Sequence, residues 1–311
     1  MRRAEGARER GCEKPNLKGA FMKIAVSGGK GGTGKTFVAT GLAIADATQR
    51  KTLLVDADVE CPNSHVLLGA KMKKAETIWG MVPKIDEEKC KRCGACARVC
   101  IKKAISAPEG FPPVIMPELC VGCGACVLAC PTHALTASRK KIGRISTGKA
   151  HGLLLATGEL EIGEPSSGEA VSAVMEFARK KAEADRAEDI VVDCAAGIGC
   201  PVIASISTAD YLVAVTEPSP AALHDLERIW RLGRHFGMPC GIVLNKSTLS
   251  QKMAGKIRAF ARKRGIPMIG CLPFSRKIIK ATVDCRPIAL QSRAYFSKFM
   301  AILSMIRAKR P

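Results

Sequence analysis

The sequence predicts an α/β fold in which a mostly parallel sheet, covered by helices on both faces, carries a small inserted α+β module. Short, nearly continuous apolar runs alternate with longer helical segments along most of the 311 residues. Strands of this kind are buried on both faces, which is typical of a parallel sheet between two helical layers. One cysteine-rich segment interrupts the alternation. A chain of this length is sufficient for one large α/β domain and a small module.

The first predicted elements surround that interruption. Residues 23–27 form an apolar run that ends in glycines, and residues 36–48 have helical character, so a strand, a loop and a helix open the fold. The run at 52–56 predicts a second strand, which ends in carboxylates. Residues 142–163 alternate apolar and glycine positions, and predict short strands or a hairpin that returns the chain to the main sheet. Residues 167–184 predict a helix, because Ser167-Gly-Glu169 offers N-terminal capping chemistry.

The second half of the chain continues the alternation. Strands are predicted at 190–193, 211–215, 241–245 and 267–272, and helices near 219–236, 249–264 and 293–308. Ligands of such sheets bind at the carboxyl ends of the strands, and the motif residues described next fall there. The segment 295–310 has an apolar stripe with basic residues at its end. We expect it to dock on the sheet, and a helix lying on a membrane surface is the alternative.

A phosphate-binding loop follows the first predicted strand. Residues 27–36 read Ser-Gly-Gly-Lys-Gly-Gly-Thr-Gly-Lys-Thr, between a strand and a helix. In this pattern, glycines allow backbone N–H groups to converge on phosphate oxygens at a helix N-terminus. Lys35 is expected to reach the terminal phosphates and Thr36 to bind Mg²⁺, so the sequence predicts a site for ATP and Mg²⁺. The predicted nucleotide-binding residues of the loop are Gly29, Lys30, Gly31, Gly32, Thr33, Gly34, Lys35 and Thr36.

Two four-cysteine runs lie within residues 90–130 and share the spacing C-x₂-C-x₂-C-x₃-C. Bacterial ferredoxins with two [4Fe–4S] clusters have this spacing, and the fourth cysteine of each run binds the other cluster. The alternative is a pair of structural zinc sites, but these commonly use two separated C-x₂-C pairs. The predicted ligands are Cys90, Cys93, Cys96 and Cys130 for one [4Fe–4S] cluster, and Cys100, Cys120, Cys123 and Cys126 for the second.

A lysine early in the phosphate-binding loop gives the sequence Lys-Gly-Gly-Thr-Gly-Lys-Thr at 30–36. It resembles the deviant Walker A motif of the MinD, ParA, Mrp and nitrogenase iron-protein superfamily, which consists of Rossmann-like, SIMIBI-type P-loop NTPases. The resemblance continues at 56–63, at 193–201 and at 245–246, and it covers nearly the whole chain after residue 21. It implies an ATPase domain at 22–83 and 138–311, with a ferredoxin-like domain for two [4Fe–4S] clusters inserted at 84–137.

The resemblance also implies roles for individual residues. Lys30 would reach the phosphates bound to the other subunit of an ATP-dependent homodimer. Together with Lys35, it would stabilise the charge on the γ-phosphate oxygens, much as an arginine finger does. Asp58 would help position the attacking water. Asp193 would hold Mg²⁺ through water, and Asn245 would contact the adenine.

The loop after residue 193 departs from the family pattern. Family members usually have prolines where Ala195 and Ala196 stand, so its sensing of the γ-phosphate is expected to differ. Cys194 and Cys200 flank this loop, and we keep a functional role for them as a hypothesis. The cysteines outside the two runs are otherwise expected to be small buried hydrophobic residues; they are Cys12, Cys61, Cys194, Cys200, Cys240, Cys271 and Cys285.

Composition restricts the partners. The formal net charge of +21 favours an acidic partner, and the aromatic content of 4% argues against stacking platforms for single-stranded nucleic acid. No apolar run has the length of a bilayer span. No hydrophobic signal segment opens the chain, and eight cysteines have metal-ligand spacing, so we expect a reducing, cytoplasmic compartment. Residues 1–21 are polar and charged, and predict either a disordered tail or a misassigned start, since Met22 directly precedes the first predicted strand.

Three functions remain open. The first is an ATPase that gates electron transfer by two iron–sulfur clusters towards an acidic redox partner. The second is an assembly or carrier ATPase that delivers a cluster to an apo-protein. The third is a spatial organiser of the ParA or MinD kind, which binds DNA or makes peripheral membrane contact, with the clusters as redox sensors. The complete set of ferredoxin ligands favours the first.

Overall fold

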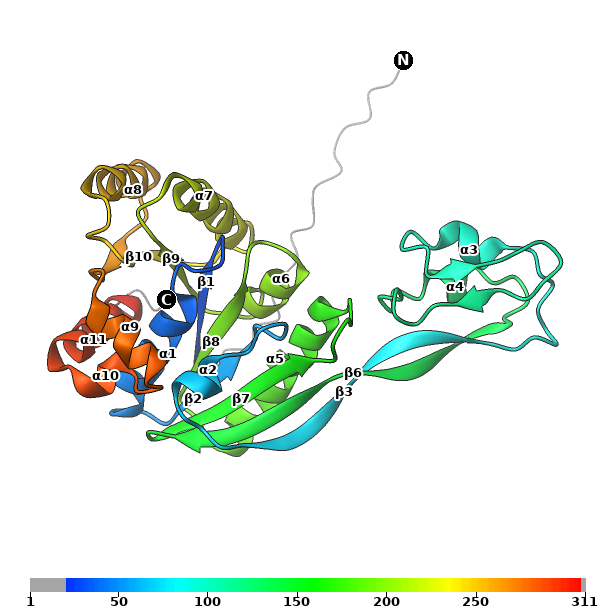
Figure 1. Cartoon of the computed structure of the whole chain (residues 1–311), viewed down its shortest axis with the longest axis horizontal. Coiled ribbons are helices and arrows are strands. Elements are labelled where there is room, and N and C mark those ends of the chain that lie inside the picture. The colour runs from blue at the N-terminus through cyan, green and yellow to red at the C-terminus, as the bar shows by residue number, and fades with distance from the viewer. Residues whose placement is uncertain (1–20, 309–311) are drawn as a thin grey trace, which may run out of the picture.

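The computed structural model describes residues 21–308, and their main body is built on one mixed sheet (Figure 1). Its parallel strands are β1 (Met22–Gly28), β2 (Thr52–Asp56), β7 (Leu153–Leu160), β8 (Asp189–Ala196), β9 (Tyr211–Thr216), β10 (Cys240–Leu244) and β11 (Met268–Cys271). They lie in the order β11-β10-β9-β1-β8-β2-β7, and every neighbouring pair is parallel. The predicted α/β fold with a mostly parallel sheet is confirmed.

Helices cover both faces of this sheet, as predicted. One layer consists of α5 (Ser167–Ala184), α6 (Cys200–Ile206), α7 (Pro220–His235) and α8 (Gln251–Arg264). The other contains α1 (Lys35–Ala47), α9 (Arg276–Val283), α10 (Ile288–Gln291) and α11 (Arg293–Arg307). Alternate residues of β1 enter the two cores, with Ala25 in the first and Ile24 and Val26 in the second. A short helix, α2 (Ser64–Leu67), follows β2.

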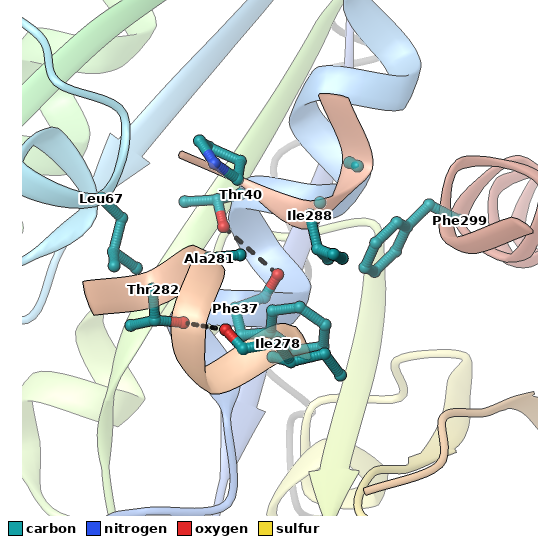
Figure 2. A pocket seen from close by; sticks show the side chains of 11 residues that line it. Phe37, Thr40, Leu67, Ile278, Ala281, Thr282, Ile288 and Phe299 are labelled. Carbon is teal, nitrogen blue, oxygen red and sulfur yellow. Dashed lines mark hydrogen bonds between the residues drawn. The ribbon is translucent and has the colours of Figure 1, made fainter. Parts of the chain in front are cut away.

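The C-terminal helix docks on the body, which confirms the expectation for this segment. Its apolar stripe is buried and consists of Phe299, Ile302, Leu303 and Ile306. Figure 2 shows a small cavity between α1, α9, α10 and α11, with the ring of Phe299 at its edge. This ring lies edge-on to Phe37 at 5.7 Å between centroids, and any Cβ at Gly41 would collide with it. Helix α11 therefore packs against α1, the helix that begins at the phosphate-binding loop.

An antiparallel two-stranded ribbon extends from the edge of the sheet that lies opposite β11. It is formed by β3 (Met72–Ile85) and β6 (Leu135–Ala150), which pair from Met72–Gly148 to Ile85–Leu135. The ribbon ends in a small module with α3 (Ala95–Val99), β4 (Ile105–Ser106), β5 (Val114–Ile115) and α4 (Ala125–Leu128). Figure 1 shows this module projecting from the body, beyond the sheet edge opposite β11. The module has a small core of its own, formed by Cys96, Ile105, Cys126 and Leu135.

Three sequence expectations change in detail. The predicted hairpin at 142–163 is present as β6 and β7, but β6 already begins at Leu135. No strand was predicted at 72–85, because β3 has exposed lysines where a buried strand would have an apolar run. Helix α5 has the predicted bounds, but its N-cap is Ser166, whose side chain makes no capping hydrogen bond. Glu169 still lies in the first turn, where a negative charge suits the helix dipole.

Residues 1–20 and 309–311 lie outside the described residues, and so do Cys12 and almost all of the predicted tail. Phe21, which was assigned to that tail, is buried and packs in the first core. Within residues 21–308, no helix has both the length and the apolar composition required to cross a bilayer.

Candidate functional site

The phosphate-binding loop connects β1 to α1 at the carboxyl end of the sheet. Gly34 is the N-cap of α1 and has a φ of +94°, in the left-handed region that favours glycine. A Cβ at this position would also collide with the amide of Asn245. Apart from the adjacent residues of the loop, no atom of the described residues lies within 4 Å of the Cβ position at Gly31 or Gly32, so this side of the loop is open. Backbone and helix terminus are thus placed as a phosphate site requires.

Residues from the end of β10 hold the loop. Asn245 donates its side-chain amide to the carbonyl of Thr33 at 2.8 Å, and Lys246 donates Nζ to the carbonyl of Gly32 at 2.7 Å. Asn245 is buried. Asn245 was predicted as a residue of this site, and the structure places it against the phosphate-binding loop. Its contact with adenine stays a prediction.

Asp56 and Asp193 end neighbouring strands and are paired in register. Asp56 accepts backbone hydrogen bonds from Asp58, Asn63 and Ser64 at 3.2, 2.9 and 2.8 Å, and so shapes the loop after β2. Burial raises the pKa of Asp56 to about 6. Burial and the adjacent Asp56 raise the pKa of Asp193 to about 8. Burial also raises the pKa of Asp58, whereas Lys35 acts in the opposite direction. A cation between these groups would favour their charged forms.

Several buried polar atoms of this site have no hydrogen-bond partner among the described residues. They are Ser27 Oγ, Thr33 Oγ1 and Asp193 Oδ1. Asp193 also accepts a hydrogen bond from Ser64 at 3.1 Å through its other oxygen. Unpaired buried polar atoms are costly, so a group that supplies partners at this place stabilises the site. A nucleoside triphosphate with a hydrated Mg²⁺ has the donors and acceptors that these atoms require. The residues present therefore fit a bound nucleoside triphosphate with Mg²⁺.

The signature lysine is bound within its own chain. Lys30 Nζ lies 2.6 Å from Glu217 Oε1, and Lys246 Nζ lies 2.8 Å from Glu217 Oε2. Burial alone would raise the pKa of Glu217, but hydrogen bonds from Lys246 and Lys30 hold it below its ordinary value. Glu217 was not predicted as a site residue. Its position two residues after the apolar run at 211–215, at the carboxyl end of a parallel strand where functional residues lie, is the signal that could have identified it.

The loop after β8 touches the phosphate-binding loop directly. Gly197 donates its N–H to the carbonyl of Gly28 at 3.1 Å. Cys194 is fully buried, and burial raises the pKa of its thiol to about 12, so it is a packing residue. Cys200, at the start of α6, is exposed and packs beside Gly168 of α5.

The expectation of buried cysteines outside the two runs is wrong for most of those that the structure describes. Cys194 is buried and Cys240 is half-buried. The exposed cysteines are Cys61, Cys200, Cys271 and Cys285. They lie in loops or at the ends of helices and strands, and such positions are at the protein surface.

The module contains two cavities, and each is lined by four cysteines. The first is lined by Cys90, Cys93, Cys96 and Cys130, and the second by Cys100, Cys120, Cys123 and Cys126. Each set therefore takes its fourth member from the other run, as the sequence predicts. Sulfur atoms accept backbone hydrogen bonds in both, from Arg92 to Cys90 at 3.4 Å and from Ala104 to Cys100 at 3.2 Å. Such hydrogen bonds to sulfur are typical of iron–sulfur sites.

The two runs also share their backbone conformation. Gly94 and Gly124 cap α3 and α4 with φ values of +66° and +75°. Left-handed residues recur at the third position of each run (Arg92 and Gly122) and three residues after its last cysteine (Lys103 and His133). The module is thus an internal repeat of two halves with similar spacing and backbone conformation.

No single-ion site accompanies these cavities: in the described part of the chain, no group of three or more His, Cys, Asp or Glu side chains could hold a metal ion. The ligands of structural zinc converge on one ion at about 2.0–2.3 Å. The thiolates of a four-iron cluster instead bind separate iron atoms, so they are spread around a larger group. This finding does not itself support an iron–sulfur cluster either, so the group that the cavities take is a matter of proposal.

Comparison with known proteins decides the family. The CobQ/CobB/MinD/ParA nucleotide-binding domain model matches residues 24–288. The chain belongs to this family. An uncharacterized protein of Methanocaldococcus jannaschii, MJ0578, is 35% identical over 233 residues, which cover 75% of this chain and 80% of that protein. An uncharacterized ATP-binding protein of the same organism, MJ0547, is 26% identical over 272 residues, with 86% and 80% covered.

A solved structure agrees with the fold. The septum site-determining protein MinD of Pyrococcus horikoshii, in complex with Mg-ADP, superposes with a TM-score of 0.60 at 16% identity. The match covers 92% of this chain and 96% of that protein. The protein is an ATP-binding ATPase of the MinD/ParA type, and the resemblance drawn from the segments 30–36, 56–63, 193–201 and 245–246 is confirmed at this level. A relation to the nitrogenase iron protein stays a prediction.

Proposed function

We propose that this MinD/ParA-type protein is an ATPase that gates electron transfer through two [4Fe–4S] clusters held in the cysteine module. The observation that carries the proposal is the pair of cavities lined by Cys90, Cys93, Cys96 and Cys130, and by Cys100, Cys120, Cys123 and Cys126. Ferredoxin spacing predicts these two sets. The clusters would supply one-electron storage and transfer at low potential.

The nucleotide half of the proposal uses the loop between β1 and α1. Residues 29–36 would bind the phosphates of ATP, with Lys35 on the terminal phosphates and Thr36 on Mg²⁺. Asp193 would hold Mg²⁺ through water, and Asp58 would orient the water that attacks the γ-phosphate. Hydrolysis gives ADP and phosphate. Lys30 would act across an ATP-dependent homodimer, so catalysis would require that two chains close on each other.

The two cavities lie one after the other along the ribbon. Met81 and Pro83 of β3 line the second cavity, whereas Ile85 of β3 and Leu135 of β6 line the first. Because the ribbon pairs outward from residue 72 to residue 85, the second cavity lies nearer the ATPase body and the first lies at the far end. We propose that a reduced one-electron donor protein passes an electron to one cavity, and that an oxidised acceptor protein, of acidic surface, takes it from the module. We place the protein in the reducing cytoplasm, where free thiolates persist.

The test is to purify the protein without oxygen, count iron and sulfide, and record EPR spectra after reduction. We expect about eight iron atoms per chain, since two [4Fe–4S] clusters contain that number. The midpoint potentials are then measured with no nucleotide, with MgADP and with a non-hydrolysable MgATP analogue. A nucleotide-dependent shift supports gating. Mononuclear zinc in place of iron, or potentials that ignore nucleotide, would contradict the proposal.

A second candidate is favoured by the family itself. The MinD of P. horikoshii is a septum site-determining protein, so this chain could position another macromolecule, with the module as a redox sensor. Pelleting with DNA or with anionic liposomes, with and without ATP, separates the two: ATP-dependent pelleting with potentials unaffected by nucleotide favours the organiser. Delivery of iron and sulfide to an apo-ferredoxin under ATP would instead favour a carrier.

A further inference from the structure

The cysteine module contacts the ATPase body through the loop of residues 117–123, which carries two cysteines of the second cavity. Lys140, on β6, donates Nζ to the carbonyl of Pro117 at 2.6 Å and to that of Cys120 at 3.1 Å. The same Nζ lies 2.9 Å from Glu164 Oε2. Both side chains of this ion pair are largely buried, at 16% exposure for Lys140 and 7% for Glu164. Screening by water is therefore weaker than for a surface pair.

Glu164 belongs to the segment that leads into α5. Its other oxygen, Oε1, accepts the backbone N–H of Ser166, the N-cap of that helix, at 3.1 Å. In the first turn of α5, Glu169 places Oε2 within 3.2 Å of the position where a Cβ of Gly122 would lie. The start of α5 therefore touches the loop 117–123 both through Lys140 and directly at Gly122.

The start of α5 also touches the nucleotide side. A Cβ at Gly168 would lie 2.9 Å from the Cβ of Cys200, so the two helices are in close contact at this point. Cys200 begins α6 and directly follows the loop after β8. That loop is hydrogen-bonded to the phosphate-binding loop, from the N–H of Gly197 to the carbonyl of Gly28. Contacts are thus continuous from the phosphate site to the second cysteine cavity.

We propose that Lys140 is a positioning residue that couples nucleotide binding to the second cysteine cavity. A shift of the loop after β8, residues 197–199, when its glycines meet a γ-phosphate, would move the starts of α6 and α5. Glu164 would carry this movement to Lys140, and Lys140 would carry it to the carbonyls of Pro117 and Cys120. The backbone around Cys120 and Cys123 would then change its position relative to the group in the cavity. This inference rests on the proposed function for its purpose, but the mechanical coupling itself does not depend on iron.

The chain offers a matched control for this residue. Lys141, the next residue on β6, pairs with Glu161 of the same segment at 2.6 Å. Both partners are exposed, at 45% and 43%, and among the described residues the basic groups that act on Glu161 are Lys141, Arg144 and Lys74, none of them in the module. Lys140→Met and Lys141→Met therefore remove the same charge from the same strand, but only the first breaks the contact with the loop 117–123. Lys140→Arg retains a donor and should preserve part of the coupling.

The experiment is hydrogen–deuterium exchange of the anaerobically purified full chain, with and without a non-hydrolysable MgATP analogue. We expect the analogue to change the exchange rates of amides 118–123 by about two- to thirtyfold, as is usual for coupling between sites. Lys140→Met should abolish this change while nucleotide affinity is retained. Lys141→Met should keep it. An unchanged nucleotide response in Lys140→Met, or no response of these amides in the unmutated protein, would overturn the proposal.

The redox readout separates this inference from the proposed function. If the module contains clusters, the nucleotide-dependent shift in the potential of one of them should vanish in Lys140→Met and persist in Lys141→Met. If the unmutated protein shows the exchange response but no iron, the coupling stands and the electron-transfer function fails. If it contains iron and its potentials respond to nucleotide equally in Lys140→Met, the function stands and the coupling through Lys140 fails.

Discussion

Lys30 and Glu217 form an ion pair within one chain, with 2.6 Å between Nζ and Oε1. Lys30 is the lysine that would act on the nucleotide of the other subunit in an ATP-dependent dimer. In the proposed dimer, Lys30 would exchange the carboxylate of Glu217 for phosphate oxygens on the other subunit. Glu217 remains paired with Lys246, which in turn holds the carbonyl of Gly32. The same carboxylate therefore restrains the signature lysine and supports the loop that binds the phosphates.

Glu217→Gln should tighten the ATP-dependent dimer by about tenfold, because hydrogen bonds to charged groups each contribute about 1.5–3 kcal/mol and one restraint on Lys30 is weakened. Analytical ultracentrifugation with a non-hydrolysable MgATP analogue measures this. Glu227→Gln, a glutamate on the surface of α7, serves as the control. Adding Lys30→Ala to Glu217→Gln should cancel the gain; a dimer that stays equally tight would show that Lys30 is not the residue released.

Crossed binding of two clusters makes a prediction that sequence order alone would not. Cys130→Ser should resemble Cys93→Ser, and Cys100→Ser should resemble Cys123→Ser, because each pair lines one cavity. Each variant should lose about half of the iron, since one of two four-iron clusters is affected. Iron analysis and EPR of the reduced protein provide the measurement. If Cys130→Ser instead matches Cys123→Ser, each run binds its own cluster.

The contact between α11 and α1 should contribute strongly to stability. Phe299 is fully buried, so Phe299→Ala should reduce the free energy of unfolding by about 3–5 kcal/mol. Gly41→Ala should cost about 1–3 kcal/mol, because its Cβ would collide with the Phe299 ring. Denaturant unfolding of the nucleotide-free protein measures both. Phe274→Ala, at a residue that is 41% exposed, should change little; equal losses at positions 274 and 299 would contradict this account of the packing.

A buried acidic pair links stability to pH at the end of the chain. Arg307 of α11 is bonded to Asp46 and, at 2.8 Å, to Asp189. Burial and Asp189 raise the pKa of Asp46 to about 6 from its ordinary 3.8, and Arg307 opposes this. Between these two values the folded protein binds a proton that the unfolded chain has lost. The contribution of Asp46 to stability is therefore full below the lower value and decreases as pH rises through about 6.

Asp46→Asn should remove this dependence. Thermal unfolding at several pH values between the two pKa values should show a flatter profile for Asp46→Asn than for the unmutated protein. Asp185→Asn is the control, because Asp185 is a partly exposed carboxylate whose pKa is lowered, chiefly by its hydrogen bond with Lys181. A profile for Asp46→Asn that declines as steeply as that of the unmutated protein would assign the pH dependence to other groups.

The sequence by itself determined the parts of this protein that depend on local pattern. The loop at 29–36 requires glycines at fixed positions between a strand and a helix, so its spacing is sufficient to predict it. The positions of the parallel strands along the chain follow from apolar runs such as 190–193, whereas their order in the sheet does not. The cysteine spacing, which is that of ferredoxins, predicts which four side chains share a cavity. Periodicity and spacing encode these features because neighbours along the chain remain neighbours in a strand or a turn.

The tertiary structure alone decided the contacts between distant segments. Strand β3 has exposed lysines and no apolar run, so only its pairing with β6 makes it a strand. Glu217 belongs to the nucleotide site because it pairs with Lys30, which is far away in the sequence. Lys140 links the module to the body because it pairs with Glu164 and donates to the loop 117–123. The partner of a charged side chain cannot be predicted from the sequence. The electrostatic energy of an ion pair depends on which opposite charge the fold brings within a few ångströms, and on how much water remains between the two groups.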